Sequence, residues 1–129
     1  MGDTAEPETL SRSRMQHLDW NRVPIEQVNP LFDRQLIVGE HIMVARLVLR
    51  KGCVVPLHSH FNEQVSNVVS GALRFTIEGE EIILRAGEYL CIPPNLPHTA
   101  TAIEDTIAID TFSPPRADWV NKTDQYLRT

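Results

Sequence analysis

The stretch GCVVPLHSHFNEQVSNVVSG, residues 52–71, decides the fold of this chain. It contains His58 and His60, separated by one residue, and Gln64 four residues further on. Side chains of an extended strand alternate between its two faces, so both imidazoles point to the same side. Gln64 can join them if residues 61–63 form a turn and the next strand brings the chain back. Two imidazoles and an amide oxygen then converge on one point.

A fourth candidate ligand, His98, follows a proline-rich turn at residues 92–97. Imidazole nitrogens together with an amide oxygen suit one divalent transition metal, such as Zn, Ni, Mn or Fe. Glu63 adjoins Gln64 but has the opposite strand phase, so we expect it to point outward or to cap the turn. If Gln64 is displaced, Glu63 is the rival ligand.

Outward from this stretch, the chain consists of short segments with alternating apolar and polar residues. This period of two indicates strands, and the Gly and Pro residues between them indicate turns. A tight turn is expected at Gly79 and Glu80. Many short strands without a long helix predict an all-β sandwich or barrel, and a jelly roll would enclose the histidines. The predicted strands are residues 35–38, 41–50, 65–69, 72–78, 81–84, 89–92, 98–103 and 106–112.

The two ends of the chain lack this pattern. Residues 1–16 are polar and predict a disordered tail. Residues 17–129 predict a single domain whose barrel core covers about residues 36–112. Before the core, Pro24 and Pro30 interrupt an irregular N-terminal arm. After the core, residues 116–127 have a weak helical pattern and predict a short helical or irregular tail.

Composition excludes several classes of protein. The chain has 129 residues, of which 42% are hydrophobic, enough for one domain with a core of its own. A net charge of −5 argues against nucleic-acid binding. We find no apolar run fit for a signal peptide or a membrane span, so a cytoplasmic protein without membrane contact is expected. Two cysteines, Cys53 and Cys91, are too few for a disulfide framework and are expected to be buried.

Two stretches resemble the motifs of the cupin superfamily. Residues 52–71 fit the first motif, G-x5-H-x-H-x3-Q-x6-G, with Gln64 at a position usually held by Glu. Residues 87–102 resemble the second motif, with Asn95 in place of its middle Gly and Ala102 in place of its final Asn. The resemblance implies a double-stranded β-helix, that is, a jelly-roll barrel, and a homodimer. It leaves the reaction open, because one fold carries many chemistries.

A narrower resemblance is to the small pectin-degradation cupins, which open 4,5-unsaturated galacturonate to a linear keto-deoxyuronate. It is carried by HSHxxEQ at residues 58–64, IPPNxxH at 92–98 and IDTFSPPRADW at 109–119. The match implies substrate or catalytic roles for Asp110, Phe112 and Arg116. It implies metal ligands at His58, His60, Gln64 and His98.

The candidate residues have simple chemical interpretations. Gln64 is neutral and leaves the full 2+ charge on a bound ion, whereas Glu would reduce that charge. A neutral ligand therefore favours Lewis-acid chemistry over oxygen activation. Asp110 is the candidate proton-transfer group, or else forms a structural hydrogen bond or ion pair. Arg116 either clamps a carboxylate or is an exposed arginine after a double proline. Phe112 is expected in the core, together with Phe75 and Tyr89.

The favoured function is a metal-dependent isomerase or lyase that acts on a small hydroxy- or keto-acid, such as an unsaturated uronate. Asp110 would move a proton, while Arg116 and Phe112 would hold the substrate. One alternative is a dioxygenase that uses Fe, Ni or Cu, which oxygen uptake would reveal. The other is a non-catalytic binding module, which would bind a small molecule tightly without turnover.

Overall fold

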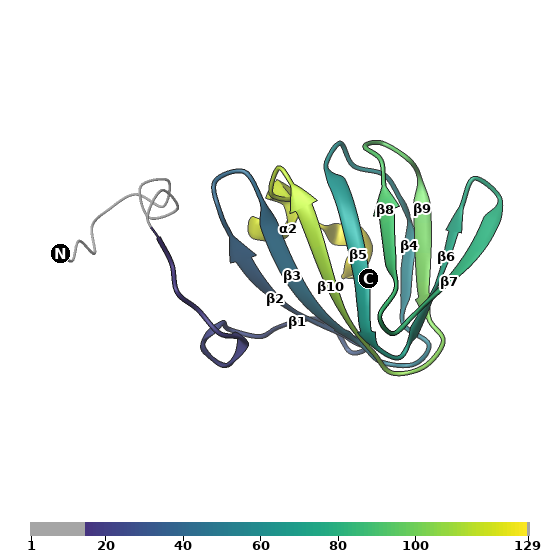
Figure 1. Ribbon diagram of the computed structural model, residues 1–129, viewed down its shortest axis with the longest axis horizontal. Helices are drawn as coiled ribbons and strands as arrows, with labels where there is room; N and C mark the ends of the chain where they lie inside the picture. The colour runs from purple at the N-terminus through teal and green to yellow at the C-terminus, as the bar shows by residue number, and fades with distance from the viewer. Residues whose placement is uncertain (1–14, 129) are drawn as a thin grey trace.

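The structure is a computed structural model that describes residues 15–128 (Figure 1). Within this range the chain forms ten strands, separated by short turns. The strands are β1 (Glu26–Asn29), β2 (Phe32–Val38), β3 (Met43–Leu49), β4 (Val54–His58), β5 (Glu63–Ser70), β6 (Ala72–Ile77), β7 (Glu80–Arg85), β8 (Tyr89–Ile92), β9 (His98–Ala102) and β10 (Thr106–Ser113).

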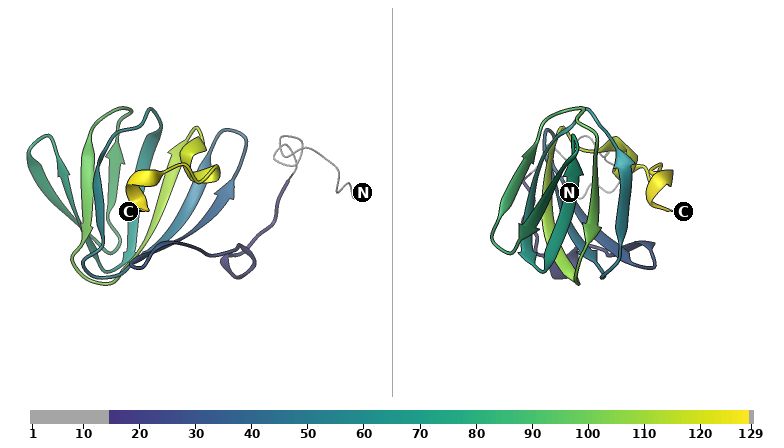
Figure 2. Two further views of the ribbon diagram at one scale, coloured as in Figure 1. Left: turned by 180° about the vertical axis from the view of Figure 1, so that it is seen from behind. Right: turned by 90° about the vertical axis from the view of Figure 1, so that its right-hand side faces the viewer.

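The strands form two antiparallel sheets that face each other (Figure 2, right). One sheet has the order β1-β2-β3-β10-β5-β8 and the other has the order β4-β9-β6-β7. The inner pairs are nested: β6 pairs with β7, β5 with β8, β4 with β9, and β3 with β10. Such nested antiparallel pairs arise when one long hairpin curls into two facing sheets. The pairing confirms the predicted jelly roll.

Strand alternation places the core between the sheets. In β3 the side chains of Met43, Ala45, Leu47 and Leu49 are all buried, while the residues between them are partly exposed. In β6, Leu73, Phe75 and Ile77 are buried in the same way. In β10 the buried face carries Ala108, Asp110 and Phe112, as predicted. A carboxyl group and an aromatic ring therefore share the inner face of a central strand.

The hairpin between β6 and β7 needs two residues with positive φ. Glu78 has a φ of 52° and Gly79 a φ of 79°, the combination of a tight two-residue turn whose twist matches that of the flanking strands. The predicted turn at Gly79 and Glu80 is therefore displaced by one residue, and Glu80 already belongs to β7.

The sheet begins earlier than the predicted core boundary at residue 36. Strand β1 lies in the predicted irregular arm and forms an antiparallel hairpin with β2, of which residues 35–38 were predicted as a strand. Pro30 lies in the turn between them rather than inside a strand, and the Asn29 Oδ1 accepts a hydrogen bond of 2.9 Å from the Leu31 N–H. Phe32 enters the core and is 1% exposed. The prolines thus mark the ends of β1, not the absence of strands.

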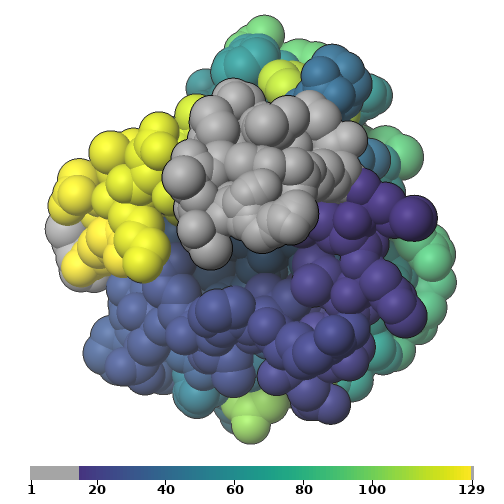
Figure 3. All heavy atoms as spheres, turned by 90° about the vertical axis from the view of Figure 1, so that its left-hand side faces the viewer, coloured from purple at the N-terminus to yellow at the C-terminus, as the bar shows by residue number. Residues whose placement is uncertain are grey.

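The arm before β1 is shorter than predicted, and it contains the 3-10 helix η1 (Trp20–Arg22). The Gln35 side chain donates hydrogen bonds to the carbonyls of Trp20 and Val23. In Figure 3 this arm (purple) and the C-terminal segment (yellow) occupy different parts of one face. Of the predicted disordered tail, residues 1–14 lie outside the described range, and Met15 and Gln16 are exposed without regular structure.

The C-terminal tail is helical in short pieces, as predicted. Helix α2 (Ala117–Val120) and the 3-10 helix η2 (Gln125–Leu127) cross in front of the sheets (Figure 2, left). Trp119 and Leu127 bury their side chains. The Asn29 amide donates a hydrogen bond of 2.8 Å to the Leu127 carbonyl, so this tail is attached to the end of β1.

Two predictions of burial were wrong. Tyr89 is 69% exposed and Cys91 is exposed, whereas Cys53, Phe75 and Phe112 are buried as expected. Tyr89 and Cys91 alternate with Leu90 and Ile92 on β8, which lies at one edge of its sheet, and they occupy the outer face.

Among residues 15–128, no helix has the length and apolar character that crossing a bilayer requires.

Candidate metal centre

Three histidines meet between the two sheets. His58 is the last residue of β4 and His98 is the first residue of β9, and the two are direct cross-strand partners. His60 follows in the connection to β5. One ring nitrogen from each of the three lies within 4.8 Å of the others. Nested pairing of β4 with β9 therefore brings together residues that are forty positions apart in the sequence.

Backbone carbonyls fix the orientation of all three imidazoles. The Nδ1 atom lies 2.7 Å from the Pro56 carbonyl in His58, 3.0 Å from the Asn62 carbonyl in His60, and 2.8 Å from the Leu96 carbonyl in His98. A carbonyl oxygen can only accept, so each Nδ1 carries the hydrogen. Each Nε2 is then left with a lone pair, which is the arrangement found in histidines that bind metals.

Burial keeps these imidazoles neutral. It lowers the pKa of His58 and of His60 to about 4, and the nearby positive charge of Arg116 acts in the same direction. Burial also lowers the pKa of His98. Neutral imidazoles are the form that coordinates a metal ion, so the group needs to lose no proton before an ion binds at neutral pH.

Two of the Nε2 atoms lack a suitable partner within the described residues. The His98 Nε2 is buried and accepts no hydrogen bond. The His60 Nε2 lies 3.1 Å from the Gln64 Oε1. A neutral His60 has a single N–H, and its Nδ1 already uses it, so two lone pairs face each other at this contact. A divalent cation bound between these atoms would satisfy both, and the residues therefore fit a metal ion.

Gln64 holds its amide oxygen towards the histidines. Its Nε2 donates to the Ser66 Oγ at 2.9 Å and to the Asp110 Oδ2 at 3.3 Å, which turns Oε1 the other way. The His60 Nε2 and the Gln64 Oε1 are 3.1 Å apart, close enough for one bound ion to contact both. Glu63, the rival candidate, is exposed.

A pocket opens beside the histidine group. His58, Gln64, His98, Asp110 and Arg116 supply its polar wall. The space inside it, including the open mouth, is about 430 Å³. The remaining wall is apolar and is formed by Phe32, Leu47, Leu49, Val55, Leu73, Phe75, Ala100, Phe112 and Trp119. A few convergent polar groups in an apolar pocket are typical of a small-molecule site.

Asp110 is buried in this pocket wall. It lies opposite Ser66 in the pairing of β10 with β5, and its Oδ1 has no hydrogen-bond partner among the described residues. Burial raises the pKa of Asp110 to about 7, against the opposite effects of the Ser66 hydroxyl and of Arg116. A bound cation would favour the ionised form and lower this pKa. No ion pair holds Asp110 in the described part of the chain, so a proton-transfer role stays available to it.

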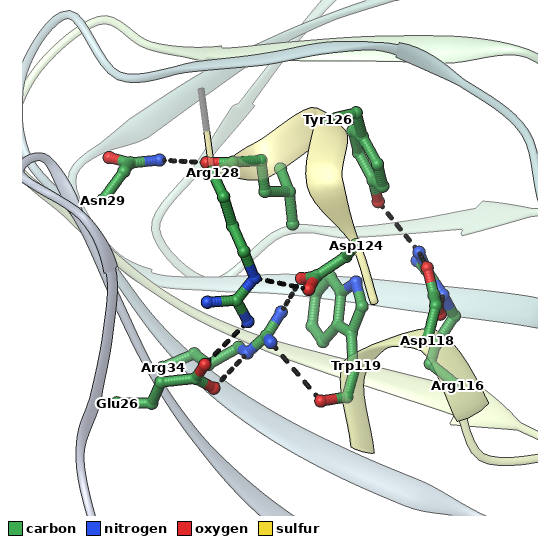
Figure 4. Close-up of polar contacts among 10 residues, drawn as sticks. Glu26, Asn29, Arg34, Arg116, Asp118, Trp119, Asp124, Tyr126 and Arg128 are labelled. Carbon is green, nitrogen blue, oxygen red and sulfur yellow. Dashed lines mark hydrogen bonds and ion pairs between the residues drawn. The ribbon is translucent and has the colours of Figure 1, made fainter. Parts of the chain in front are cut away.

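Arg116 is 2% exposed, which rules out the exposed arginine that the double proline made possible. Its Nε and Nη2 donate to the two carboxylate oxygens of Asp118 at 2.9 Å and 2.7 Å. Nη2 also donates to the Tyr126 hydroxyl at 2.8 Å (Figure 4). The guanidinium lies over the rings of Phe112 and Trp119, with 5.3 Å and 4.7 Å to their centroids. These contacts fix its position beside the pocket.

Sequence reasoning missed the residues that the C-terminal tail contributes. The Tyr126 ring stacks on the His58 imidazole, with 4.9 Å between centroids and an interplanar angle of 27°. Trp119 packs edge-on against Phe112 at 5.1 Å. Neither aromatic residue belongs to a metal-binding motif, and Tyr126 lies far from His58 in the sequence. Trp119 ends the stretch IDTFSPPRADW but was given no role, and for Tyr126 the weak helical pattern of the tail was the only signal, which did not indicate the site.

Comparisons with known proteins find a matching family model and several similar proteins. A family model described as a cupin domain matches residues 45–110. The pectin degradation protein KdgF of Dickeya dadantii is 30% identical over 103 residues, which cover 78% of this chain and 94% of that protein. The solved structure of KdgF from Halomonas sp. superposes with a TM-score of 0.77 at 28% identity, covering 82% of this chain and 99% of that one.

A solved cupin described as RmlC-like, from Shewanella frigidimarina, is equally similar in structure. Its TM-score is 0.77 at 30% identity, with 82% of this chain and 96% of that chain covered. Oxalate decarboxylase from Bacillus subtilis is similar in fold, with a TM-score of 0.67 at 18% identity over 75% of this chain and 29% of that one.

Proposed function

The chain belongs to the cupin family, and from this premise we propose that it is a metal-dependent isomerase that linearises an unsaturated uronate. The observation that carries the proposal is the composition of one pocket wall. Two of the three candidate metal-ligand imidazoles, His58 and His98, line the same pocket as a buried carboxyl group and a buried guanidinium. The similarity to KdgF, a pectin degradation protein, supports a uronate as the substrate class.

His58, His60, His98 and Gln64 are the residues that would hold the ion. A divalent ion without an anionic ligand supplies Lewis-acid activation of a bound oxygen atom. The chain fixes these ligands through backbone carbonyls and through the amide contacts of Gln64, so they need little rearrangement. This rigidity keeps the site ready for the substrate.

Arg116 and Phe112 would hold the substrate. The two N–H groups on the Arg116 Nη1 make no hydrogen bond among residues 15–128, so they can bind the carboxylate of a uronate. Phe112 forms apolar wall under the guanidinium. Together they orient the sugar ring relative to the histidine group and to Asp110.

Asp110 would move the proton. In a 4,5-unsaturated uronate, removal of the proton from the anomeric hydroxyl lets the bond between C1 and the ring oxygen break. The products of this step are an aldehyde at C1 and an enolate at C5, and protonation of C4 turns the enolate into the linear keto acid. Asp110 can take the first proton and return one to C4, so the reaction is a net isomerisation that needs no further reactant.

The test is a spectroscopic assay. The conjugated double bond of 4,5-unsaturated galacturonate absorbs ultraviolet light, and linearisation removes this absorption. We expect the metal-loaded protein to accelerate the loss well above the spontaneous rate, with no uptake of oxygen. A rate equal to the spontaneous one would refute this substrate. Oxygen uptake would point to a dioxygenase, and tight binding without turnover to a binding module.

A further inference from the structure

Tyr126 connects the two halves of the polar pocket wall. Its ring stacks on His58, and its hydroxyl accepts a hydrogen bond from the Arg116 Nη2 at 2.8 Å. It belongs to η2, which lies outside the region matched by the cupin family model, residues 45–110. One side chain of the C-terminal segment therefore touches a candidate metal ligand and the candidate carboxylate-binding arginine at once.

Buried ion pairs fix the segment that carries Tyr126. Asp124, two residues earlier, pairs with Arg34 at 2.7 Å, and both side chains are fully buried. Arg128, two residues later, pairs with Asp124 at 2.9 Å and with Glu26 at 2.7 Å (Figure 4). The segment is thus held on both sides of Tyr126 to the β1–β2 hairpin. These ion pairs on both sides of Tyr126 fix where the tyrosine hydroxyl lies.

The hydrogen bonds of Arg116 explain what this position achieves. A guanidinium has five N–H donors in one plane. Asp118 takes one donor from Nε and one from Nη2, and the Tyr126 hydroxyl takes the second donor of Nη2. Within residues 15–128, Nη1 is left with two N–H groups that make no hydrogen bond. With Asp118 and Tyr126 holding one side of the plane, the guanidinium cannot rotate away from the pocket that it lines.

We propose that Tyr126 is a positioning residue: its hydroxyl holds Arg116 so that Nη1 faces a substrate carboxylate, and its ring holds the His58 imidazole. The proposal rests on the proposed function in one respect, namely that the ligand is a uronate. It adds a residue from outside the cupin motifs to the site, and it assigns a role to the C-terminal segment.

The hydroxyl is tested with Tyr126→Phe, which keeps the ring. The measured quantity is the Kd of galacturonate, a saturated uronate that cannot react, on protein loaded with Zn²⁺. We expect this Kd to rise about 3- to 10-fold, a modest effect because the hydrogen bond that is lost positions Arg116 and does not itself contact the ligand. In turnover of the unsaturated uronate, KM should rise by a similar factor and kcat should change less than about 2-fold.

The ring is tested with Tyr126→Leu and Zn²⁺ alone. Loss of the stacked ring frees the His58 imidazole, and residues that orient metal ligands typically contribute about 10-fold or more to metal affinity. We expect a weaker zinc affinity in this variant and an unchanged one in Tyr126→Phe. Tyr89→Phe is the matched control, since Tyr89 is the other tyrosine of the chain and is 69% exposed. It should change neither quantity.

The outcomes separate this proposal from the proposed function. Galacturonate binding that weakens in Tyr126→Phe supports the role of Tyr126 even if the unsaturated uronate is not converted. Conversion by the wild type with unchanged KM and Kd in Tyr126→Phe overturns the role of Tyr126 and leaves the isomerase intact. If the wild-type protein does not bind galacturonate, the role proposed for Tyr126 is overturned as well. Equal zinc affinities in Tyr126→Phe and Tyr126→Leu overturn the part assigned to the ring.

Discussion

Asp110 and Gln64 share a hydrogen bond, yet they have different tasks in the proposed site. Gln64 presents an oxygen to the histidine group, and Asp110 keeps one carboxylate oxygen free of hydrogen bonds among the described residues. Each residue can be changed to its near-isosteric counterpart, Asp to Asn and Gln to Glu. These exchanges alter charge and protonation while preserving shape, so they separate chemistry from packing.

Asp110→Asn should lower kcat by about 10²-fold or more, because an amide cannot take up the proton that general base catalysis requires. The Kd of galacturonate and the affinity for Zn²⁺ should change far less. Steady-state kinetics with the unsaturated uronate, alongside calorimetric titration of each ligand, measure all three. If turnover and affinity fell together, Asp110 would be a structural residue, as its buried position also permits.

Gln64→Glu should bind Zn²⁺ at least as tightly as the wild type but turn over more slowly. The added carboxylate reduces the net charge of the ligand shell and so weakens the Lewis acid, and it also faces Asp110. We expect a drop in kcat of about 10-fold, which corresponds to about 1.4 kcal/mol in the barrier. A competition titration for zinc, read beside the rate, checks the two effects. Wild-type kcat in this variant would show that ligand charge has no influence on the reaction.

Three candidate ligands could be proposed from local spacing, and the fourth, His98, from the proline-rich turn before it. His58 and His60 follow strand alternation, and Gln64 and His98 each follow a turn marked in the sequence. The partners of Arg116 were not predictable in the same way. Asp118 is close in sequence, but Tyr126 reaches Arg116 through a segment whose path depends on buried ion pairs between distant parts of the chain. No local pattern encodes that path.

At the level of elements, the turn from β5 to β6 depends on Gly71. Its φ is 90°, and a Cβ at this position would meet the Asp105 carbonyl oxygen and lie 2.7 Å from the Thr106 Cα. Thr106 is itself fixed, because its hydroxyl bonds the backbone N–H and carbonyl of Ala72. Backbone of the neighbouring strand therefore occupies the space that any other side chain would need.

Gly71→Ala should destabilise the fold by about 3 kcal/mol or more, from a strained φ and a clash with backbone. The matched control is Gly87→Ala: Gly87 has a φ of 86°, but nothing lies within 4 Å of a Cβ placed there. That variant should lose about 1–2 kcal/mol from strain alone. Urea unfolding gives both values from the midpoint and slope. Equal losses in the two variants would mean that the clash is relieved by movement of the β10 start.

Prediction of the elements succeeded where alternation was complete and failed where one residue type gave a misleading signal. β3, β6 and β10 show the expected buried faces. The β1–β2 hairpin was missed because Pro30 suggested a break, although proline fits the turn between two strands. Tyr89 was placed in the core for its aromatic ring, but the face of an edge strand is set by its neighbours, which the sequence does not reveal.

At the level of the whole molecule, ion pairs join the start of the sheet to the end of the chain. Glu26 on β1 accepts hydrogen bonds from Arg34 at 3.0 Å and from Arg128 at 2.7 Å. Arg34 and Arg128 also bond the two carboxylate oxygens of Asp124. Asp124 and Arg128 belong to the same segment as Tyr126. The network therefore also holds Tyr126 in place beside the candidate site.

The pH dependence of stability tests this network. Burial acts to raise the pKa of Glu26, but the hydrogen bonds and charges of Arg128 and Arg34 outweigh it, so the pKa is lowered from its ordinary value of 4.5. A carboxyl group with a lowered pKa in the folded state stabilises the fold above its unfolded pKa. That stabilisation is lost as the pH falls through the folded value, below about 4.5.

Glu26→Gln removes this contribution while keeping the shape of the side chain. We expect the variant to be less stable than the wild type by about 1 kcal/mol at pH 7, the upper range for a partly exposed ion pair. The difference in unfolding free energy should stay constant down to about pH 5 and shrink at lower pH, since protonated Glu26 resembles glutamine. Urea unfolding at a series of pH values measures it. A difference that persisted unchanged at pH 3 would show that packing, not charge, accounts for the contribution of Glu26 to the contact between β1 and the C-terminal segment.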